Sequence, residues 1–149
     1  MGSLYRSRHE LIAVFRKPGG SHRNNVQLGK FGRNRTNVWN YPGANSFSRK
    51  GEEGNLLALH PTVKPVAMIA DAILDCSAPG ELVLDGFLGS GSTLIAAERT
   101  RRHCYGIEID PEYVDVAIRR WQQVTGRQAI HAVSQKSFDD LAKEQTNVG

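Results

Sequence analysis

The apolar positions in the second half of the chain follow two different spacings. Residues 66–74 repeat at the i, i+3, i+4, i+7, i+8 spacing of one helix face, and Pro65 suits the first turn of a helix. Residues 81–85, ELVLD, instead form a short and nearly continuous apolar run, which is typical of a strand covered on both faces. The sequence therefore predicts a helix beginning near Pro65 and a strand over residues 81–85.

The same patterns predict four further elements. A glycine-rich loop follows the first strand and leads into a helix expected over residues 93–100, and CYGIEI (104–109) has the composition of a second strand. Asp110 is placed to cap a helix that begins at Pro111, and QAIHAV (128–133) suggests a third strand. Strand, helix, strand, helix, strand is the order of a parallel, doubly wound α/β sheet.

The first third of the chain has a different composition. Residues 1–50 contain ten Lys or Arg and one acidic residue, whereas residues 51–149 contain nine Lys or Arg and fourteen acidic residues. A short apolar run predicts a strand over 10–15, and residues 18–59 are then rich in Gly, Asn, Ser and Arg, with aromatic residues between them. This composition favours contact with a polyanion through base stacking and phosphate binding, although a solvated basic surface or a mobile loop would have the same composition.

Several classes of protein are disfavoured. No apolar stretch approaches the roughly 20 residues that cross a membrane, and the first residues lack the apolar core of a secretory signal. Cys76 and Cys104 have no CxxC spacing and lie in apolar periodic segments, so we expect two buried thiols and neither a disulfide nor a metal site. These features are typical of a cytoplasmic protein.

The loop within VLDGFLGSGST (83–93) contains three glycines, which would let a ligand approach the backbone closely. It has the glycine spacing of a phosphate-binding loop, but Ser92 stands where that loop requires a lysine. Gly89 and Gly91 begin a dinucleotide-binding motif, but its third glycine position holds Leu94. A triphosphate, a dinucleotide and a merely tight turn are therefore weaker alternatives to a nucleoside cofactor without phosphates.

Two acidic residues favour such a cofactor. Asp85 ends the first strand, and Glu108 lies near the end of the second, 23 residues later, which is close to the spacing at which a carboxylate binds ribose hydroxyls. Acidic groups at both strand ends, with no basic residue in the loop, would repel phosphates and attract a sulfonium or an ammonium group. The pattern points to S-adenosylmethionine.

Three motifs together resemble the amino-group DNA methyltransferases of the N6-adenine/N4-cytosine class: HPTVKP (60–65), LDGFLGSGST (84–93) and GIEIDPEY (106–113). They resemble most closely the subgroup with a permuted order, in which the catalytic motif comes first, followed by target recognition, the HPTxKP helix and the cofactor loop. Two further segments are similar to family features: YRSRHELIAVFRK (5–17) to a strand and turn beside the target-base pocket, and RTNVWNYPG (35–43) to part of the recognition region. The resemblance covers residues 4–133.

The resemblance implies a Rossmann-like, S-adenosylmethionine-dependent methyltransferase fold in four parts: a strand and turn (1–17), a basic irregular recognition segment (18–59), a cofactor-binding α/β core (60–135) and a polar tail (136–149). Within that core, Glu108 would hold the ribose, while Thr62 and Lys64 would meet the carboxylate of the cofactor. The implied cofactor-binding residues are Asp85, Phe87, Gly89, Gly91, Ser92, Thr93, Glu108, Ile109, Asp110, His60, Pro61, Thr62 and Lys64. The DNA-binding candidates are Arg6, Arg8, Arg23, Arg33, Arg35 and Trp39.

One element of that family is absent from the sequence. Its catalytic motif, Asp/Asn/Ser-Pro-Pro-Tyr/Phe, contains adjacent prolines, and none of the six prolines here is next to another. We therefore expect the C-terminal part of a DNA methyltransferase, inactive alone, with an incomplete sheet whose strand 82–85 has an open edge unless a missing N-terminal part, a complementary chain or a second copy covers it. A module that binds without transferring methyl groups, and an enzyme acting on RNA, protein or a small molecule, remain alternatives.

Overall fold

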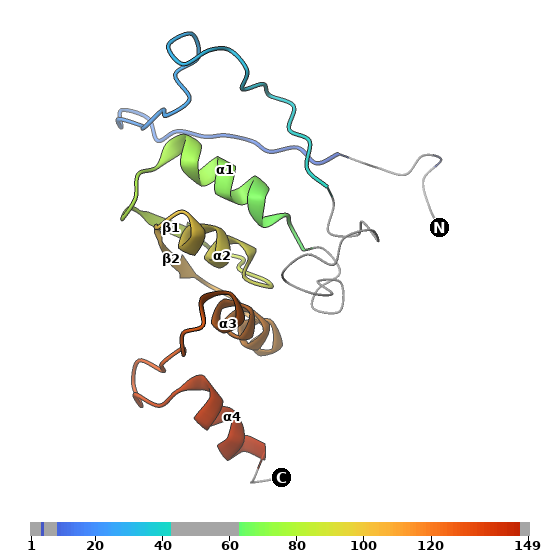
Figure 1. The fold of residues 1–149 in the computed structure, drawn as a ribbon, viewed down its shortest axis with the longest axis vertical. Helices are drawn as coiled ribbons and strands as arrows, with labels where there is room; N and C mark the ends of the chain where they lie inside the picture. The colour runs from blue at the N-terminus through green and yellow to red at the C-terminus, as the bar shows by residue number, and fades with distance from the viewer. Residues whose placement is uncertain (1–3, 5–8, 43–62, 147–149) are drawn as a thin grey trace.

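The computed structural model describes residues 4, 9–42 and 63–146. Its elements, in chain order, are α1 (Val66–Cys76), β1 (Leu82–Asp85), α2 (Ser92–Arg99), β2 (His103–Gly106), α3 (Pro111–Thr125) and α4 (Phe138–Thr146). Figure 1 shows them following one another along the long axis of the molecule, with the first segment at one end and α4 at the other. No helix in the described parts is long and apolar enough to cross a membrane.

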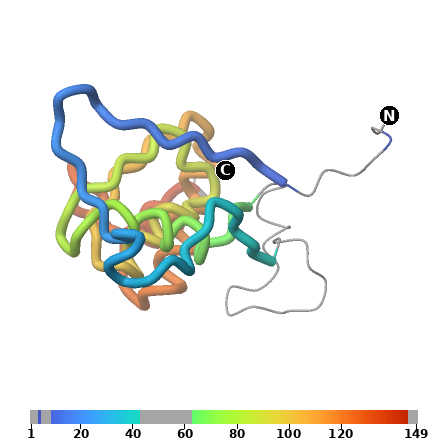
Figure 2. The backbone as a smooth tube through the Cα atoms, turned by 90° about the horizontal axis from the view of Figure 1, so that it is seen from above, coloured from blue at the N-terminus to red at the C-terminus, as the bar shows by residue number. Residues whose placement is uncertain are grey.

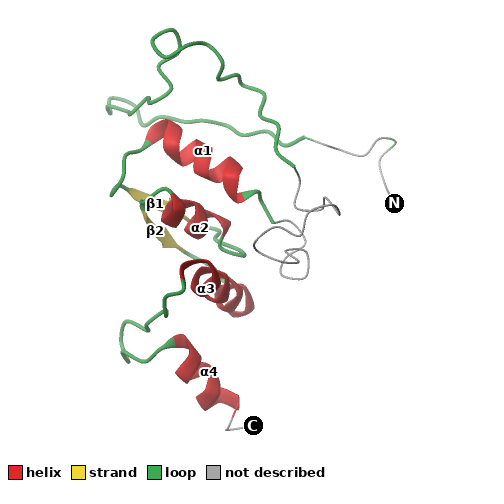
Figure 3. Cartoon of the chain, in the orientation of Figure 1, coloured by secondary structure: helices red, strands yellow, loops and turns green. Residues whose placement is uncertain are grey.

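The two strands form a parallel sheet, which confirms the expected α/β class (Figure 3). Leu84 of β1 lies opposite Tyr105 of β2, and Val83 lies opposite Cys104. Because side chains alternate between the faces of a sheet, these two pairs point in opposite directions. Val83 and Cys104 pack on the hydrophobic core, whereas Leu84 and Tyr105 are 68% and 65% exposed.

The hydrophobic core lies between the sheet and two helices. Its buried residues come from α1 and α2: Val66, Ile73, Ile95, Ala96 and Ala97. The helix predicted near Pro65, the helix after the glycine loop and the helix at Pro111 are all confirmed. At α3, the carboxylate of Asp110 accepts a hydrogen bond of 2.9 Å from the backbone N–H of Glu112, as a helix cap does.

Three expectations about strands need correction. Residues 10–15 are irregular, because no other described segment pairs with them, and Val14 and Phe15 are exposed. Residues 128–133 also form no strand, apart from one isolated bridge between Ile130 and Ser137. The second strand is shorter than expected and ends at Gly106.

The end of the chain also differs from expectation, because the polar tail contains α4. The backbone N–H of Asp140 donates to the Ser137 hydroxyl at 3.1 Å, and that hydroxyl donates to the Asp140 carboxylate at 2.7 Å. Ser-Phe-Asp-Asp therefore has the Ser-x-x-acid spacing of a capped helix start. The expectation of two buried thiols is wrong for Cys76, which is exposed, while Cys104 is half-buried.

The first segment, residues 9–42, contains no helix or strand and lies along α1. It runs out along the helix and returns beside it (Figures 1 and 2). Asn25 holds it to the end of α1, where its side-chain amide donates to the carbonyls of Leu74 and Ser77, both at 2.7 Å. The irregular structure expected from the composition is confirmed for residues 18–42, the described part of the stretch for which it was predicted.

Candidate cofactor site and candidate nucleic-acid interface

The candidate cofactor site lies where the two parallel strands end. Asp85, the last residue of β1, is in register with Gly106, the last residue of β2. Because the strands are parallel, their carboxyl ends lie at the same edge of the sheet, which is where ligands bind in open α/β folds. The glycine loop, residues 86–91, leaves from β1 at this edge, and the chain from Ile107 to Asp110 leaves from β2.

The glycine loop is held by backbone hydrogen bonds and by close packing. The Leu88 N–H donates to the Ile107 carbonyl at 3.0 Å, which ties the loop to the end of β2. Gly91 has a φ of +81°, and a Cβ there would lie 2.9 Å from Cβ of Ala117 on α3. A Cβ on Gly106 would lie 2.6 Å from the Leu88 side chain. Glycine is thus required at Gly91 for its dihedral angle and for its contact.

Glu108 connects the two sides of the site. Its carboxylate accepts three backbone hydrogen bonds, from Gly89 at 2.6 Å, Ile109 at 2.9 Å and Asp110 at 3.0 Å. These donors fix the carboxylate at the strand ends, where the sequence predicted a ribose-binding acid. A ligand entering the site would meet an acid whose orientation is already set.

Asp85, at the end of β1, directly precedes the glycine loop. Its carboxylate accepts a hydrogen bond of 3.0 Å from the N–H of Phe87. Burial, with a further contribution from the Asp85 carboxylate, raises the pKa of the Cys104 thiol beneath the site. The side chains of Phe87 and Ile109 are almost fully exposed at its rim.

The structure thus brings most of the predicted cofactor residues to one edge of the sheet: Asp85, Phe87, Gly89, Glu108, Ile109 and Asp110. Gly91 and Ser92 are buried behind the loop, where α2 begins, and Thr93 is half-buried beside them. His60, Pro61 and Thr62 lie outside the described residues. The ammonium of Lys64 is 2.6 and 2.7 Å from the two carboxylate oxygens of Glu10, so it connects the start of α1 to the first segment.

Arg120 was missed by the sequence reasoning. It is only 4% exposed, and its guanidinium donates to the Ser90 carbonyl at 2.5 Å, to the Ser90 hydroxyl at 3.1 Å and to the Ser92 hydroxyl at 3.4 Å. A signal was present, because Arg120 lies three residues after the small apolar Ala117 and therefore on the same side of a helix that begins at Pro111. Arg120 therefore supports the glycine loop from the side of α3.

The DNA-binding candidates differ in what they contact. Arg23 forms an ion pair of 2.8 Å with Glu81. Arg35 donates to the Asp75 carboxylate at 2.7 and 3.1 Å and to Asp71 at 3.3 Å, and these hydrogen bonds, above all those to Asp75, raise the pKa of Arg35. The Arg35 guanidinium also lies 4.2 Å from the ring centre of Trp39.

Arg33 is the candidate that stays available to a ligand. It is exposed and forms no hydrogen bond or ion pair with the residues described in the structure. Arg6 and Arg8 lie outside the described ranges. Within the described part of the chain no group of three or more His, Cys, Asp or Glu side chains could hold a metal ion.

Comparison with known proteins gives a consistent set of relatives. Residues 3–119 match the model of the N6/N4 methyltransferase family, described as DNA methylase. Type II methyltransferase M.ScaI from Streptomyces caespitosus is 34% identical over 70% of this chain and 36% of its own length. DNA adenine methyltransferase YhdJ from Escherichia coli K12 is 36% identical over 72% of this chain and 31% of its own length. The chain therefore spans about a third of these relatives.

Two solved structures are also similar. The M1.HpyAVI–SAM complex is 39% identical, with a TM-score of 0.41 over 42% of this chain and 30% of that one. A putative DNA modification methylase from Thermus thermophilus, complexed with S-adenosyl-L-methionine, is 37% identical, with a TM-score of 0.41 over 43% of this chain and 27% of its own.

Proposed function

Because this chain belongs to the N6/N4 family of DNA methylases, we propose that it is the cofactor-binding and DNA-recognition part of an enzyme that methylates the exocyclic amine of adenine, or alternatively of cytosine, in duplex DNA. In this proposal residues 60–135 hold S-adenosylmethionine and residues 18–59 contact the DNA. One observation carries it: two carboxylates, of Asp85 and Glu108, lie at adjacent strand ends around a loop without a basic residue.

The charges of the site favour an adenosyl sulfonium over a polyphosphate. Asp85 and Glu108 would attract a cationic group and repel a phosphate. The cation expected nearby, Lys64, is bound to the Glu10 carboxylate. A phosphate at this loop would therefore face two acids, whose carboxylates already accept the N–H groups of Phe87 and Gly89.

The chain's own residues would bind and orient the cofactor. Glu108, fixed by three N–H donors, would accept hydrogen bonds from ribose hydroxyls. The exposed Phe87 and Ile109 would lie against the flat base. When bound, S-adenosylmethionine supplies the electrophilic methyl group.

Methyl transfer would also need groups that this sequence lacks. No two prolines are adjacent, so the family's catalytic motif must come from a polypeptide outside these 149 residues. The structure supports such a partner, because β1 pairs only with β2 among the described residues and one face of the sheet exposes Leu84 and Tyr105. We expect an added strand at the free edge of β1, and apolar side chains across that face.

Calorimetric titration with S-adenosylhomocysteine tests the cofactor assignment. Asp85→Asn removes the charge but keeps an oxygen acceptor for the Phe87 N–H, and it should weaken binding strongly. Glu108→Gln should also weaken binding, because an amide oxygen is a poorer acceptor than a carboxylate. Asp115→Asn, on the exposed side of α3, is the matched control. Binding of ATP or NAD at the loop, without binding of S-adenosylhomocysteine, would contradict the proposal.

A methyl-transfer assay on duplex DNA tests whether the catalytic motif is supplied by another polypeptide. The chain alone should bind cofactor without transferring methyl groups, and activity should appear when an upstream polypeptide with the Asp-Pro-Pro-Tyr motif is added. Activity of the chain alone would refute this account of the chemistry. A dimer in sedimentation experiments that Leu84→Asp disrupts would instead assign the exposed face of the sheet to a second copy.

A further inference from the structure

We infer that residues 26–34, here called the recognition turn, are the part of the first segment that binds duplex DNA, with Lys30 and Arg33 on phosphates and Phe31 in apolar contact with a sugar or base. The inference rests on the proposed function and assigns the DNA contact to one structural unit. Three observations support it: both ends of the turn are fixed on α1, its backbone has a defined shape, and its outer surface is basic and apolar.

The two ends of the recognition turn are held by the same turn of α1. At one end, the Asn25 backbone N–H donates to the Asp75 carbonyl at 2.9 Å, and its side chain donates to the carbonyls of Leu74 and Ser77. At the other end, Arg35 binds the Asp75 carboxylate. A single helical residue, Asp75, thus closes the loop from both sides.

The turn also has internal hydrogen bonds. The Gly29 N–H donates to the Gly32 carbonyl at 2.9 Å, and the Lys30 N–H donates to the Gln27 carbonyl at 3.0 Å. Gly29 and Gly32 have φ angles of +95° and +99°, which glycine adopts without strain. The turn therefore presents its side chains from an ordered backbone.

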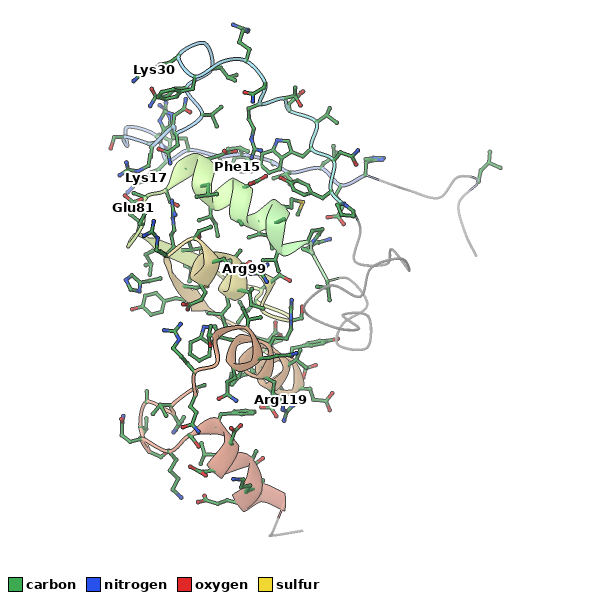
Figure 4. The ribbon with its side chains drawn as sticks, in the orientation of Figure 1. Phe15, Lys17, Lys30, Glu81, Arg99 and Arg119 are labelled. Carbon is green, nitrogen blue, oxygen red and sulfur yellow. The ribbon has the colours of Figure 1, made fainter. Side chains whose placement is uncertain are left out.

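The outer surface of the turn suits a nucleic acid. Phe31 is 66% exposed, and the Lys30 ammonium lies 5.1 Å from the centre of its ring. Figure 4 shows Lys30 at the outer side of the turn, away from α1. The sequence from 26 to 34 contains no acid, and Asp71 and Asp75, which lie beside the turn on α1, are bound to Arg35. A cation over an exposed ring, with a second exposed cation, Arg33, two residues further along the chain, matches a surface that binds phosphates and packs against nucleotides.

The attachment to α1 connects the proposed DNA contact to the cofactor site. The core joins α1 to α2, and α2 begins at the end of the glycine loop. DNA bound at the recognition turn would therefore be held at a fixed position relative to the cofactor site. Arg35 and Trp39, two of the original DNA-binding candidates, act in this arrangement as supports of the turn.

Anisotropy measurements with duplex DNA at a series of salt concentrations test the inference. Replacing both cations, Lys30→Gln with Arg33→Gln, should lower the slope of log affinity against log salt by about 2, since each phosphate contact contributes about 0.9. Phe31→Ala should weaken binding about tenfold and leave the slope unchanged. The control pair, Arg119→Gln with Lys136→Gln, removes two exposed cations that are paired with acids, one on α3 and one just before α4.

The outcomes separate this inference from the proposed function. Binding by the unmodified chain, with an unchanged slope in the Lys30 and Arg33 variant, would overturn the inference alone. Absence of salt-dependent binding by the unmodified chain would overturn the proposed DNA contact and the inference together. Binding of phosphatidylserine vesicles that needs Lys30 and Arg33, and that duplex DNA does not displace, would assign the turn to an anionic lipid surface and refute it.

Discussion

The glycine loop and the recognition turn are both irregular, both contain glycines with positive φ, and both are attached to a helix, but they are held in different ways. The loop is fixed from within the fold, by the backbone hydrogen bond from Leu88 to Ile107 just after β2, by the contact of Gly91 with Ala117, and by the buried Arg120. The turn is fixed at its two ends by side chains that remain partly in water, those of Asn25 and Arg35. A site for a small cofactor needs the first kind of support, whereas a surface that follows DNA can use the second.

The largest expected effect concerns the packing of the glycine loop on α3. Gly91→Ala should destabilise the chain by about 3 kcal/mol, because it adds a left-handed alanine and a methyl group 2.9 Å from Ala117. Denaturant unfolding measures the loss. Gly80 has the same φ of +81° but nothing within 4 Å of its Cβ position, so Gly80→Ala should cost only about 1–2 kcal/mol. Equal losses in the two variants would show that contact with α3 does not fix the loop.

The second effect concerns Arg120. Arg120→Met keeps much of the buried volume but leaves the Ser90 carbonyl without its donor, and it should cost about 2 kcal/mol of stability. It should also weaken S-adenosylhomocysteine binding, because the loop loses its support. The control is the neighbouring Arg119, whose ion pair with Asp115 is exposed, so Arg119→Met should change stability by less than about 0.5 kcal/mol. An Arg120→Met variant that is less stable but binds the ligand equally well would show that the glycines alone shape the site.

A smaller and local effect is expected at the recognition turn. Arg35→Met should lower global stability by less than about 1 kcal/mol, because its ion pairs are partly exposed. It should accelerate hydrogen exchange at the amides of Gly29 and Lys30, which are bonded only within the turn. Arg23→Met removes an exposed ion pair from the same segment and should leave those amides unchanged. Unchanged exchange in the Arg35 variant would mean that Asn25 alone holds the turn.

The difference between the glycine loop and the recognition turn also explains which features could be predicted from the sequence. Helices α1, α2 and α3 and strand β1 followed from local signals, such as a helical period from Val66 and the Asp110–Pro111 start of α3. The acids at the strand ends were likewise readable from the sequence. The bonds that hold the first segment follow from no local pattern, because Arg35 meets Asp71 and Asp75 across 36 and 40 residues. An arginine in a basic, aromatic stretch is equally suited to DNA or to an ion pair.

The strand errors have a separate physical cause. Residues 10–15 have the composition of a strand, but a strand needs a hydrogen-bonding neighbour, and none of the described segments provides one. A sequence pattern indicates which face of a strand would be buried. It gives no information about whether a neighbouring strand is present to pair with it. Helix α4 has a start signal in Ser137 and Asp140, but its polar composition gives no apolar period that predicts a helix.

The smallest expected effect is a shift in the titration of Tyr41, whose hydroxyl donates to the Asp71 carboxylate beside Arg35. Burial, and then the bond to Asp71, raise the pKa of this phenol above its usual value of about 10. Because the folded chain holds the proton more tightly than the unfolded chain, the contact stabilises the fold below about pH 10 and is lost as the pH rises through the raised pKa. Ultraviolet difference titration measures it, and Asp71→Asn should return the pKa only part of the way, because burial remains. If the phenol ionises at its ordinary pKa in the unmodified chain, Tyr41 and Asp71 are separated in solution. The first segment would then be held less firmly on α1 than the glycine loop is held on α3.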